Sequence, residues 1–438
     1  MNRTIDVQDF INTHKLSRLQ IVTLLLCFLI VAVDGFDTAA IGFIAPAIRK
    51  EWQLGAAQLA PVFGAGLAGL MAGAFVFGPL ADRFGRKSVL MVCVGFFGLA
   101  SLVSASSDSL AALIAWRFLT GLGLGGAMPN SVTLSSEYAP EKHRSVLVTT
   151  MFCGFTLGSA LGGVAAAYIV ADLGWRAVLV TGGLLPLVLL PLLAWALPES
   201  VRYLVLQGAA AGRVRRILQR IAPASVPADA GFSVPEKKRP GFPVRHLFDA
   251  DLRVGTLLLW TSFFMSLLVI YLLSSWLPTV ISSTGMSLKD ASLVTAMFQV
   301  GGTVGAIGLG QWMDRSNPRR VLAWAYALAS VFVAAIGSSA GQTGWLVAAV
   351  FGAGFCVSGG QVGANALAAA FYPTHSRATG VAWASGIGRI GSVLGSMTGG
   401  WMLALGLGLP TVFLLVALPP LISAACLMLL TRFSPQRA

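Results

Sequence analysis

The chain has 438 residues, of which 56% are hydrophobic and only 11% are charged, and its formal net charge is +13. Soluble domains usually carry about 25% charged residues, so this composition excludes an ordinary soluble protein and indicates a membrane protein. The five cysteines all lie in apolar segments, without the spacing of a disulfide framework or a metal site. The sequence also lacks a nucleotide-binding loop and a Ser-His-Asp set, so we expect neither an enzyme nor a cofactor.

Twelve apolar segments follow one another along the chain, and each is long enough to cross a bilayer, which takes about 20 residues. Strands are not expected, because the apolar runs are long and show no polar alternation. The polar N-terminus, which precedes Leu19, does not have the pattern of a cleavable signal. The predicted fold class is therefore an all-α membrane protein with twelve transmembrane helices. The segments are 19–46, 57–80, 88–107, 109–132, 145–171, 175–197, 252–278, 291–313, 321–340, 344–370, 378–404 and 410–431.

Positive charge is distributed unevenly among the loops between these segments. If the N-terminus is cytoplasmic, 24 of the 30 lysines and arginines fall in cytoplasmic segments. This bias follows the positive-inside rule and predicts that both termini are cytoplasmic, with the protein in the inner membrane. The basic excess suits the anionic inner leaflet, so no nucleic-acid partner is expected.

The first span contains two carboxylates, Asp34 and Asp37, and each costs about 2.5–3.5 kcal/mol at the bilayer centre. Their spacing places both on one face of the helix. Arg117, in the fourth span, which runs in the opposite direction, lies at a similar depth and can pair with either acid. This pattern predicts a proton relay in which protonation of the acid releases the arginine; a static ion pair is the alternative. The sequence leaves open which aspartate titrates.

A long polar stretch divides the spans into six and six. It predicts an N-terminal half at 1–198, a cytoplasmic linker at 199–251 and a C-terminal half at 252–438. We expect the linker to be partly disordered, with a surface helix near 210–221.

The two halves share a repeated pattern. Leu80-Ala81-Asp82-Arg83 recurs as Trp312-Met313-Asp314-Arg315, and Gly158-Ser159-Ala160-Leu161-Gly162 recurs as Gly391-Ser392-Val393-Leu394-Gly395. The two matches have almost the same offset along the chain, as an internal repeat requires. Two halves of six spans have the same orientation, which is the parallel-repeat plan of transporters that rock around a site near the midplane.

Motifs along nearly the whole chain resemble those of a known transporter superfamily. Signatures of the major facilitator superfamily match Gly78-x-Leu80-Ala81-Asp82-Arg83-x-Gly85-Arg86-Lys87, Arg117-x-x-x-Gly121-x-Gly123-x-Gly125 and Gly154-x-x-x-Gly158-x-x-x-Gly162-Gly163. Segments similar to its aromatic acid:proton symporters are Asp34-Gly35-Phe36-Asp37-Thr38, Phe43-Ile44-Ala45-Pro46, Leu197-Pro198-Glu199-Ser200, Ser275-Trp276-Leu277-Pro278-Thr279, Tyr372-Pro373-Thr374-x-x-Arg377-Ala378-Thr379-Gly380 and Gly386-Ile387-Gly388-Arg389-Ile390-Gly391. The resemblance implies the two-half major facilitator fold and proton-coupled import of an aromatic carboxylate, with 4-hydroxybenzoate or protocatechuate as the expected substrate.

Arg389 is the predicted anchor for the substrate carboxylate. It lies about eleven residues into its span, close to the midplane, and no acid in the C-terminal spans is available to neutralise it. Its counterpart in the first half is Thr156, and a guanidinium binds carboxylates bidentately. The alternative is an ion pair with an acid of the N-terminal half. Residues expected around the substrate are Gln361 and Asn365 for a ring hydroxyl or second oxygen, and Tyr271, Trp276 and Trp383 as walls for the ring.

The signature loop implies a cytoplasmic gate that holds the outward-open state. Its ion pairs are expected among Asp82, Arg83, Arg86, Lys87, Glu137 and Arg144, with Asp314, Arg315 and Arg377 in the second half. The second copy has Asn317 where the first has Gly85, so gating should rest more on the N-terminal copy. The alternative is a charge cluster that only sets topology.

Other functions remain open at this point. The substrate can be another organic acid such as benzoate, vanillate, gentisate or muconate, and the protein can be a proton-coupled exporter. A membrane chemoreceptor for aromatic acids is disfavoured, because the central loop at 199–251 is too short for a signalling domain. The expected partners are the aromatic carboxylate, protons and the lipid bilayer, and a monomer is expected.

Overall fold

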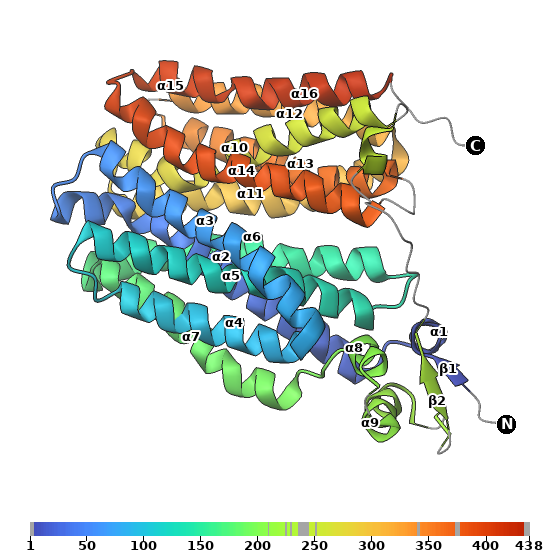
Figure 1. Ribbon diagram of the computed structural model, residues 1–438. Coiled ribbons are helices and arrows are strands. Elements are labelled where there is room, and N and C mark those ends of the chain that lie inside the picture. Colours follow the sequence, from blue (N-terminus) through green and yellow to red (C-terminus); the bar gives the residue numbers. More distant parts are fainter. Residues whose placement is uncertain are drawn as a thin grey trace. The chain divides into compact units, whose positions relative to one another are not determined.

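The computed structural model describes residues 4–208, 210–223, 226–227, 230–234, 245–249, 252–339, 342–372 and 377–432. All twelve predicted segments are helical (Figure 1). These helices are α2 (Arg18–Glu51), α3 (Ala56–Phe84), α4 (Arg86–Ser104), α5 (Leu110–Tyr138), α6 (Arg144–Leu173), α7 (Trp175–Ala196), α10 (Arg253–Ser283), α11 (Leu288–Arg315), α12 (Pro318–Gly337), α13 (Thr343–Phe371), α14 (Arg377–Ala404), α15 (Leu409–Val416) and α16 (Leu418–Leu430).

In the described part of the chain, 11 segments are both long enough and apolar enough to cross a membrane. α15 and α16 together form one of them, interrupted at Ala417 just before two consecutive prolines. α14 is the twelfth span: its 28 residues cover about 42 Å at 1.5 Å per residue. Its many glycines and Arg389 make it less apolar than the others. The all-α, twelve-helix fold class predicted from the sequence is confirmed.

Short elements outside the spans were only partly predicted. The surface helix expected near 210–221 is present as α9 (Ala211–Ile221). Two strands were not expected: β1 (Thr4–Asp6) pairs in parallel with β2 (Gly231–Ser233). The remaining elements are α1 (Val7–Thr13), α8 (Val201–Leu206) and a 3-10 helix, η2 (Arg245–Phe248). Much of the linker predicted to be disordered, including 235–244, lies outside the described residues.

The chain divides into two compact units. Unit 1 comprises Met1–Asp37, Ala68–Gly158 and Leu179–Arg239. Its core contains buried apolar residues from α2, α4, α5 and α7, for example Cys27, Phe97, Leu124 and Leu193. β1, α1, α8, α9 and β2 all belong to this unit, and Figure 1 shows them grouped beyond the ends of its long helices.

Unit 2 comprises Thr38–Leu67, Ser159–Val178 and Pro240–Ala438. α10 packs along α14, and α11 packs along α13. Small residues permit this close approach, as is usual where membrane helices pack. Gly391 of α14 lies on the backbone of Phe264, and Gly354 of α13 lies on the backbone of Phe298; a side chain at either glycine would overlap that backbone.

Candidate transport and gating sites

A buried ion pair joins α2 to α5 in unit 1. The guanidinium Nη1 of Arg117 lies 3.0 Å from Oδ2 of Asp37, and the two side chains are 3% and 0% exposed. Nη2 of Arg117 also donates to the backbone carbonyl of Asp37 at 3.4 Å. Ser101 of α4 donates its hydroxyl to the other carboxylate oxygen, Oδ1, at 2.7 Å. Both oxygens of Asp37 therefore have a partner, and water is excluded from the pair.

Glycines bring these helices close enough to bury the pair. Gly35 of α2 lies directly on the backbone of Phe155 in α6, and Gly123 of α5 lies against Phe97 of α4. Gly182 of α7 is next to the Asp37 carboxylate. Side chains at these positions would crowd the neighbouring helices, so these glycines, among them Gly123 of the fourth-span motif, have a direct packing role.

The structure shows an ion pair between Arg117 and one of the two aspartates expected from the sequence, and its role in proton coupling stays a prediction. Asp34 is buried on the same face of α2, as expected, but the ion pair is formed by Asp37. Ser101 was not predicted, because a single serine in an apolar span gives no sign of which neighbouring helix it faces. An intramembrane hydroxyl is a hint of this kind of contact, but it does not identify the acceptor.

In unit 2, Arg389 and Tyr271 come together as part of one predicted site. Nη1 of Arg389, on α14, donates to the phenol oxygen of Tyr271, on α10, at 3.1 Å. Arg389 is half-buried and Tyr271 is buried. The hydroxyl of Tyr271 thus orients the guanidinium, and its expected role as a wall for an aromatic ring stays a prediction.

The predicted polar pair on α13 has an unused acceptor. Gln361 is 8% exposed, and its Oε1 is buried without a hydrogen-bond partner among the described residues. Asn365 follows one turn later and is half-buried. An amide oxygen in this setting accepts a hydrogen bond from any hydroxyl that enters, and leaving it unsatisfied is costly.

The two predicted tryptophans lie in different surroundings. Trp276 is 2% exposed, and its indole nitrogen donates to the carbonyl of Ser396 at 2.6 Å. Phe63 packs edge-on against its ring at 5.1 Å between centroids. Protein groups therefore surround Trp276, and its role as a substrate wall stays a prediction.

Trp383 is more exposed and stacks on Trp260 of α10, with 5.8 Å between ring centroids. It precedes Arg389 by six residues, which corresponds to about 9 Å along α14. Phe248 of η2 packs edge-on against Trp260 and extends this aromatic group. Contact between Trp383 and a substrate stays a prediction.

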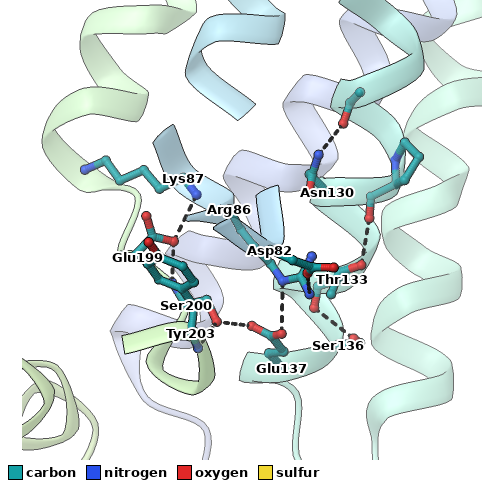
Figure 2. Close-up of polar contacts among 12 residues, drawn as sticks. Asp82, Arg86, Lys87, Asn130, Thr133, Ser136, Glu137, Glu199, Ser200 and Tyr203 are labelled. Atoms are coloured by element: carbon teal, nitrogen blue, oxygen red, sulfur yellow. Dashed lines mark hydrogen bonds and ion pairs between the residues drawn. The ribbon is translucent and has the colours of Figure 1, made fainter. Parts of the chain in front are cut away.

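A second polar network lies in unit 1, at the turn between α3 and α4 (Figure 2). Arg86 bonds Asp82 at 3.0 Å and Glu137 of α5 at 3.1 Å. The other carboxylate oxygen of Glu137 accepts the hydroxyl of Ser200 at 2.5 Å. We refer to Asp82, Arg86, Glu137, Glu199 and Ser200 as the gate network.

Glu199 connects this network to the segment after α7. Its Oε1 accepts the backbone N–H of Lys87 at 3.0 Å, and the ammonium of Lys87 donates to the carbonyl of Ala194 at 2.8 Å. Tyr203 of α8 donates to the carbonyl of Arg83 at 3.0 Å. The sequence motif that contains Glu199 and Ser200 had no structural role assigned to it. These contacts show that it ties the segment after α7 to the turn between α3 and α4 and to the end of α5.

The turn itself requires glycine. Gly85 has φ = 96°, a left-handed conformation that side chains disfavour, and any side chain there would also meet the Glu199 carboxylate. Its counterpart Asn317 has φ = −64° and caps α12 by accepting the N–H of Arg319 at 3.1 Å. The second turn therefore has a different backbone and does not need a glycine.

The other predicted gate residues are less connected. Asp314 and Arg315 are exposed at the end of α11, and neither forms an ion pair within the described ranges. Arg377 donates to the carbonyl of Tyr372 at 3.4 Å at the beginning of α14. Arg144, the first residue of α6, lines a small cavity beside Glu137. The gate residues predicted in the N-terminal half therefore lie in or next to one network. Those predicted in the C-terminal half, Asp314, Arg315 and Arg377, do not form such a network in the described part of the chain.

The chain is similar to known transporters in sequence and in fold. A family model described as Major Facilitator Superfamily matches residues 27–291 and 259–438. The chain is 49% identical over 429 residues to the 4-hydroxybenzoate transporter PcaK of Pseudomonas aeruginosa, covering 97% of this chain and 95% of that protein. It is 47% identical over 425 residues to a gallate transporter of Pseudomonas putida, covering 97% and 94%. It is 37% identical over 392 residues to the 3-(3-hydroxy-phenyl)propionate transporter of Escherichia coli, covering 90% and 89%.

Among solved structures, the fold is similar to the xylose transporter XylE from E. coli in a partially occluded inward-open conformation. The TM-score is 0.74, the sequence identity is 19%, and the match covers 96% of this chain and 98% of that chain. At this identity the similarity concerns the fold alone.

Proposed function

The chain belongs to the major facilitator superfamily, and from this premise we propose that it is a proton-coupled symporter that imports an aromatic carboxylate. It is a multi-pass membrane transporter and not an enzyme. Relatives named for 4-hydroxybenzoate and for gallate are similar to it at nearly equal identity, 49% and 47%. Both compounds combine a benzene ring, a carboxylate and a para-hydroxyl group. We propose a hydroxybenzoate of this class, such as 4-hydroxybenzoate or protocatechuate, as the substrate.

The observation that carries the proton-coupling part is the buried Asp37–Arg117 pair. A buried ion pair is costly to break by removing one charge, because the remaining charge is left without compensation. Protonation of Asp37 cancels the attraction and lets Arg117 move, and return of Arg117 expels the proton. Asp34, three residues earlier on the same buried face, offers a second carboxylate for the displaced guanidinium. A monovalent carboxylate carried with one proton is electroneutral.

Recognition of the substrate is assigned to the Arg389–Tyr271 pair and to α13. The guanidinium fork presents parallel N–H groups to a carboxylate, and Tyr271 holds the fork in place. The vacant Oε1 of Gln361, assisted by Asn365, is suited to accept a ring hydroxyl. Trp276 and Trp383 keep their proposed place around the ring.

For the transport cycle, we propose that the halves 1–198 and 252–438 rock against each other, joined by the linker 199–251. The gate network lies on the cytoplasmic side, in agreement with the basic loops, and both termini are cytoplasmic in a bacterial inner membrane. Within unit 2, Gly42 lies on the backbone of Ser274, and the Lys289 ammonium lies 4.5 Å from the Tyr168 ring centroid. We assign these contacts to a closed extracellular side. The functional unit is a monomer.

The test uses purified protein in liposomes with radiolabelled 4-hydroxybenzoate. With an imposed inward pH gradient, the unmodified protein should accumulate substrate, whereas Asp37→Asn should exchange it across the membrane without accumulation. Asp172→Asn, which removes an exposed carboxylate at the end of α6, is the matched control and should behave as the unmodified protein. Full accumulation by Asp37→Asn would refute this coupling site, and absence of transport for all hydroxybenzoates would refute the substrate class.

A further inference from the structure

A small cavity lies next to the gate network in unit 1, and it contains an excess of positive charge. Its volume is about 140 Å³. Apolar residues of α1 and Val234 form part of its wall, and Glu137, Arg144 and Arg202 form the charged part. Figure 2 shows Glu137, which lines the cavity, next to Ser200.

The charges in this cavity do not balance. Both oxygens of Glu137 are already engaged, one by Arg86 at 3.1 Å and the other by Ser200 at 2.5 Å. Neither Arg144 nor Arg202 forms an ion pair in the described part of the chain. The Nε of Arg144 is buried, and it has no hydrogen-bond partner there. Two arginines therefore line one cavity, and its one lining carboxylate, Glu137, is already bonded to Arg86 and Ser200.

We propose that this cavity binds a small oxyanion, a phosphate or a carboxylate, between Arg144 and Arg202. A guanidinium binds such oxygens through paired, charge-assisted hydrogen bonds, and two of them supply a complementary charge on either side. Arg86 neutralises Glu137, which limits the repulsion that this carboxylate would exert on an anion. The volume of the cavity is sufficient for one phosphate-sized ion and insufficient for a nucleotide.

An anion at this position would connect two elements of the inner gate. Arg144 begins α6, and Arg202 is in α8, two residues after Ser200 of the gate network. Bridging them would stabilise the contacts between α5, α6 and α8. We expect a bound oxyanion to slow the conformational cycle, so that the cytoplasmic anion concentration regulates transport. The binding site stands on this geometry alone, whereas its regulatory effect rests on the proposed transport function.

Binding is tested with full-length protein in detergent and inorganic phosphate as the probe. Phosphate should raise the unfolding temperature more than chloride at the same ionic strength and pH. Arg202→Gln, at an exposed position, should weaken phosphate affinity by at least about 10-fold, the equivalent of one charge-assisted hydrogen bond at about 1.5 kcal/mol. Arg144→Lys keeps the charge but removes the fork, so its affinity should be intermediate. Arg213→Gln, on the exposed face of α9 and outside the cavity, should bind phosphate normally.

Two results would overturn the proposal: no phosphate-specific stabilisation of the unmodified protein, or the same stabilisation in Arg202→Gln. The occupant is identified in an Arg389→Gln variant, which weakens binding of the acid at the transport site. If 4-hydroxybenzoate competes with phosphate in this variant, the imported acid is the natural occupant of the cavity. If phosphate binding is unaffected by 4-hydroxybenzoate, the natural occupant is inorganic phosphate. Loss of transport in Asp37→Asn leaves these binding results unchanged, so the two hypotheses fail separately.

Discussion

Replacement of Arg389 should weaken substrate binding selectively for carboxylates. The guanidinium is half-buried and bonded to Tyr271 at 3.1 Å, so it is already oriented before a carboxylate arrives. A hydrogen bond to a charged group contributes about 1.5–3 kcal/mol. At about 1.4 kcal/mol per decade, Arg389→Ala should reduce affinity for 4-hydroxybenzoate by about 10- to 100-fold.

Conservative variants separate charge from geometry at this position. Arg389→Lys should recover only part of the affinity, because an ammonium lacks the planar fork. Tyr271→Phe removes one oriented hydrogen bond, worth about 0.5–1.5 kcal/mol, and should reduce affinity by about 2- to 10-fold. Arg320→Ala, which removes an exposed guanidinium from α12, is the matched control and should have no effect.

The assay is calorimetric or fluorimetric binding to purified protein, with 4-hydroxybenzamide as the uncharged analogue. The unmodified protein should prefer the acid over the amide, and this preference should disappear in Arg389→Ala. Equal binding of acid and amide by the unmodified protein would refute carboxylate recognition. Normal acid binding by Arg389→Ala would show that Arg389 has a structural role and that another residue anchors the substrate.

Three further predictions concern the buried pair and the gate network. Gly85→Ala places a side chain at φ = 96° and against Glu199, so it should lower the unfolding temperature through about 1–3 kcal/mol of strain, whereas Gly78→Ala, which faces open space, should not. Ser101→Ala removes a hydrogen-bond donor from the Asp37 carboxylate and should lower the free energy of unfolding by about 1.5–3 kcal/mol. The control is Ser104→Ala, which removes a hydroxyl bonded to the carbonyl of Ala100 in the same helix and should cost less than about 1 kcal/mol. Equal losses for the two variants in thermal or denaturant unfolding would contradict this prediction. Glu137→Gln breaks the ion pair with Arg86 and should reduce the initial rate of uptake more than Asp82→Asn does. The reason is that Asp82 is 70% exposed, so water screens its pairing with Arg86. A larger loss of uptake in Asp82→Asn would argue against Glu137 as the central gate residue.

The positions of the helices were predictable because hydropathy is a local property. The segment 57–80 corresponds to α3 at Ala56–Phe84, and 344–370 corresponds to α13 at Thr343–Phe371. These two helices extend slightly beyond the predicted ends, since helical backbone continues after the apolar run ends. β1 and β2 could not be predicted, because each is very short and their pairing joins the N-terminus to the central linker.

Pairing between helices was only partly predictable. The depth of Arg117 restricted its partner to Asp34 or Asp37, because rise per residue gives depth along a helix. The choice of Asp37 depends on helix rotation and on Ser101, and sequence spacing does not determine either. Trp276 illustrates the same limit: the sequence did not predict that its nitrogen is bonded to Ser396, and its role as a wall for the substrate stays a prediction.

The repeat explains why the gate network is confined to the first copy of the signature. When Asp82 is matched to Asp314 and Gly158 to Gly391, Arg86 corresponds to Pro318 or Arg319, so the basic residue comes one position later than in the first copy. Glu137 corresponds to an alanine (Ala369 or Ala370), and Glu199 corresponds to Thr431 or Arg432. The second copy thus has the basic residue but neither of the carboxylates that engage the first turn. Arg319 accordingly donates to the backbone carbonyl of Leu430 at 3.3 Å, and Asn317 caps α12 in an ordinary helical-entry conformation. Without a carboxylate at the position equivalent to Glu199, the second turn has no group that would require the left-handed glycine. The asparagine at position 317 therefore fits a turn that lacks these acids, and we expect an ion-pair gate to rest on the N-terminal copy of the signature.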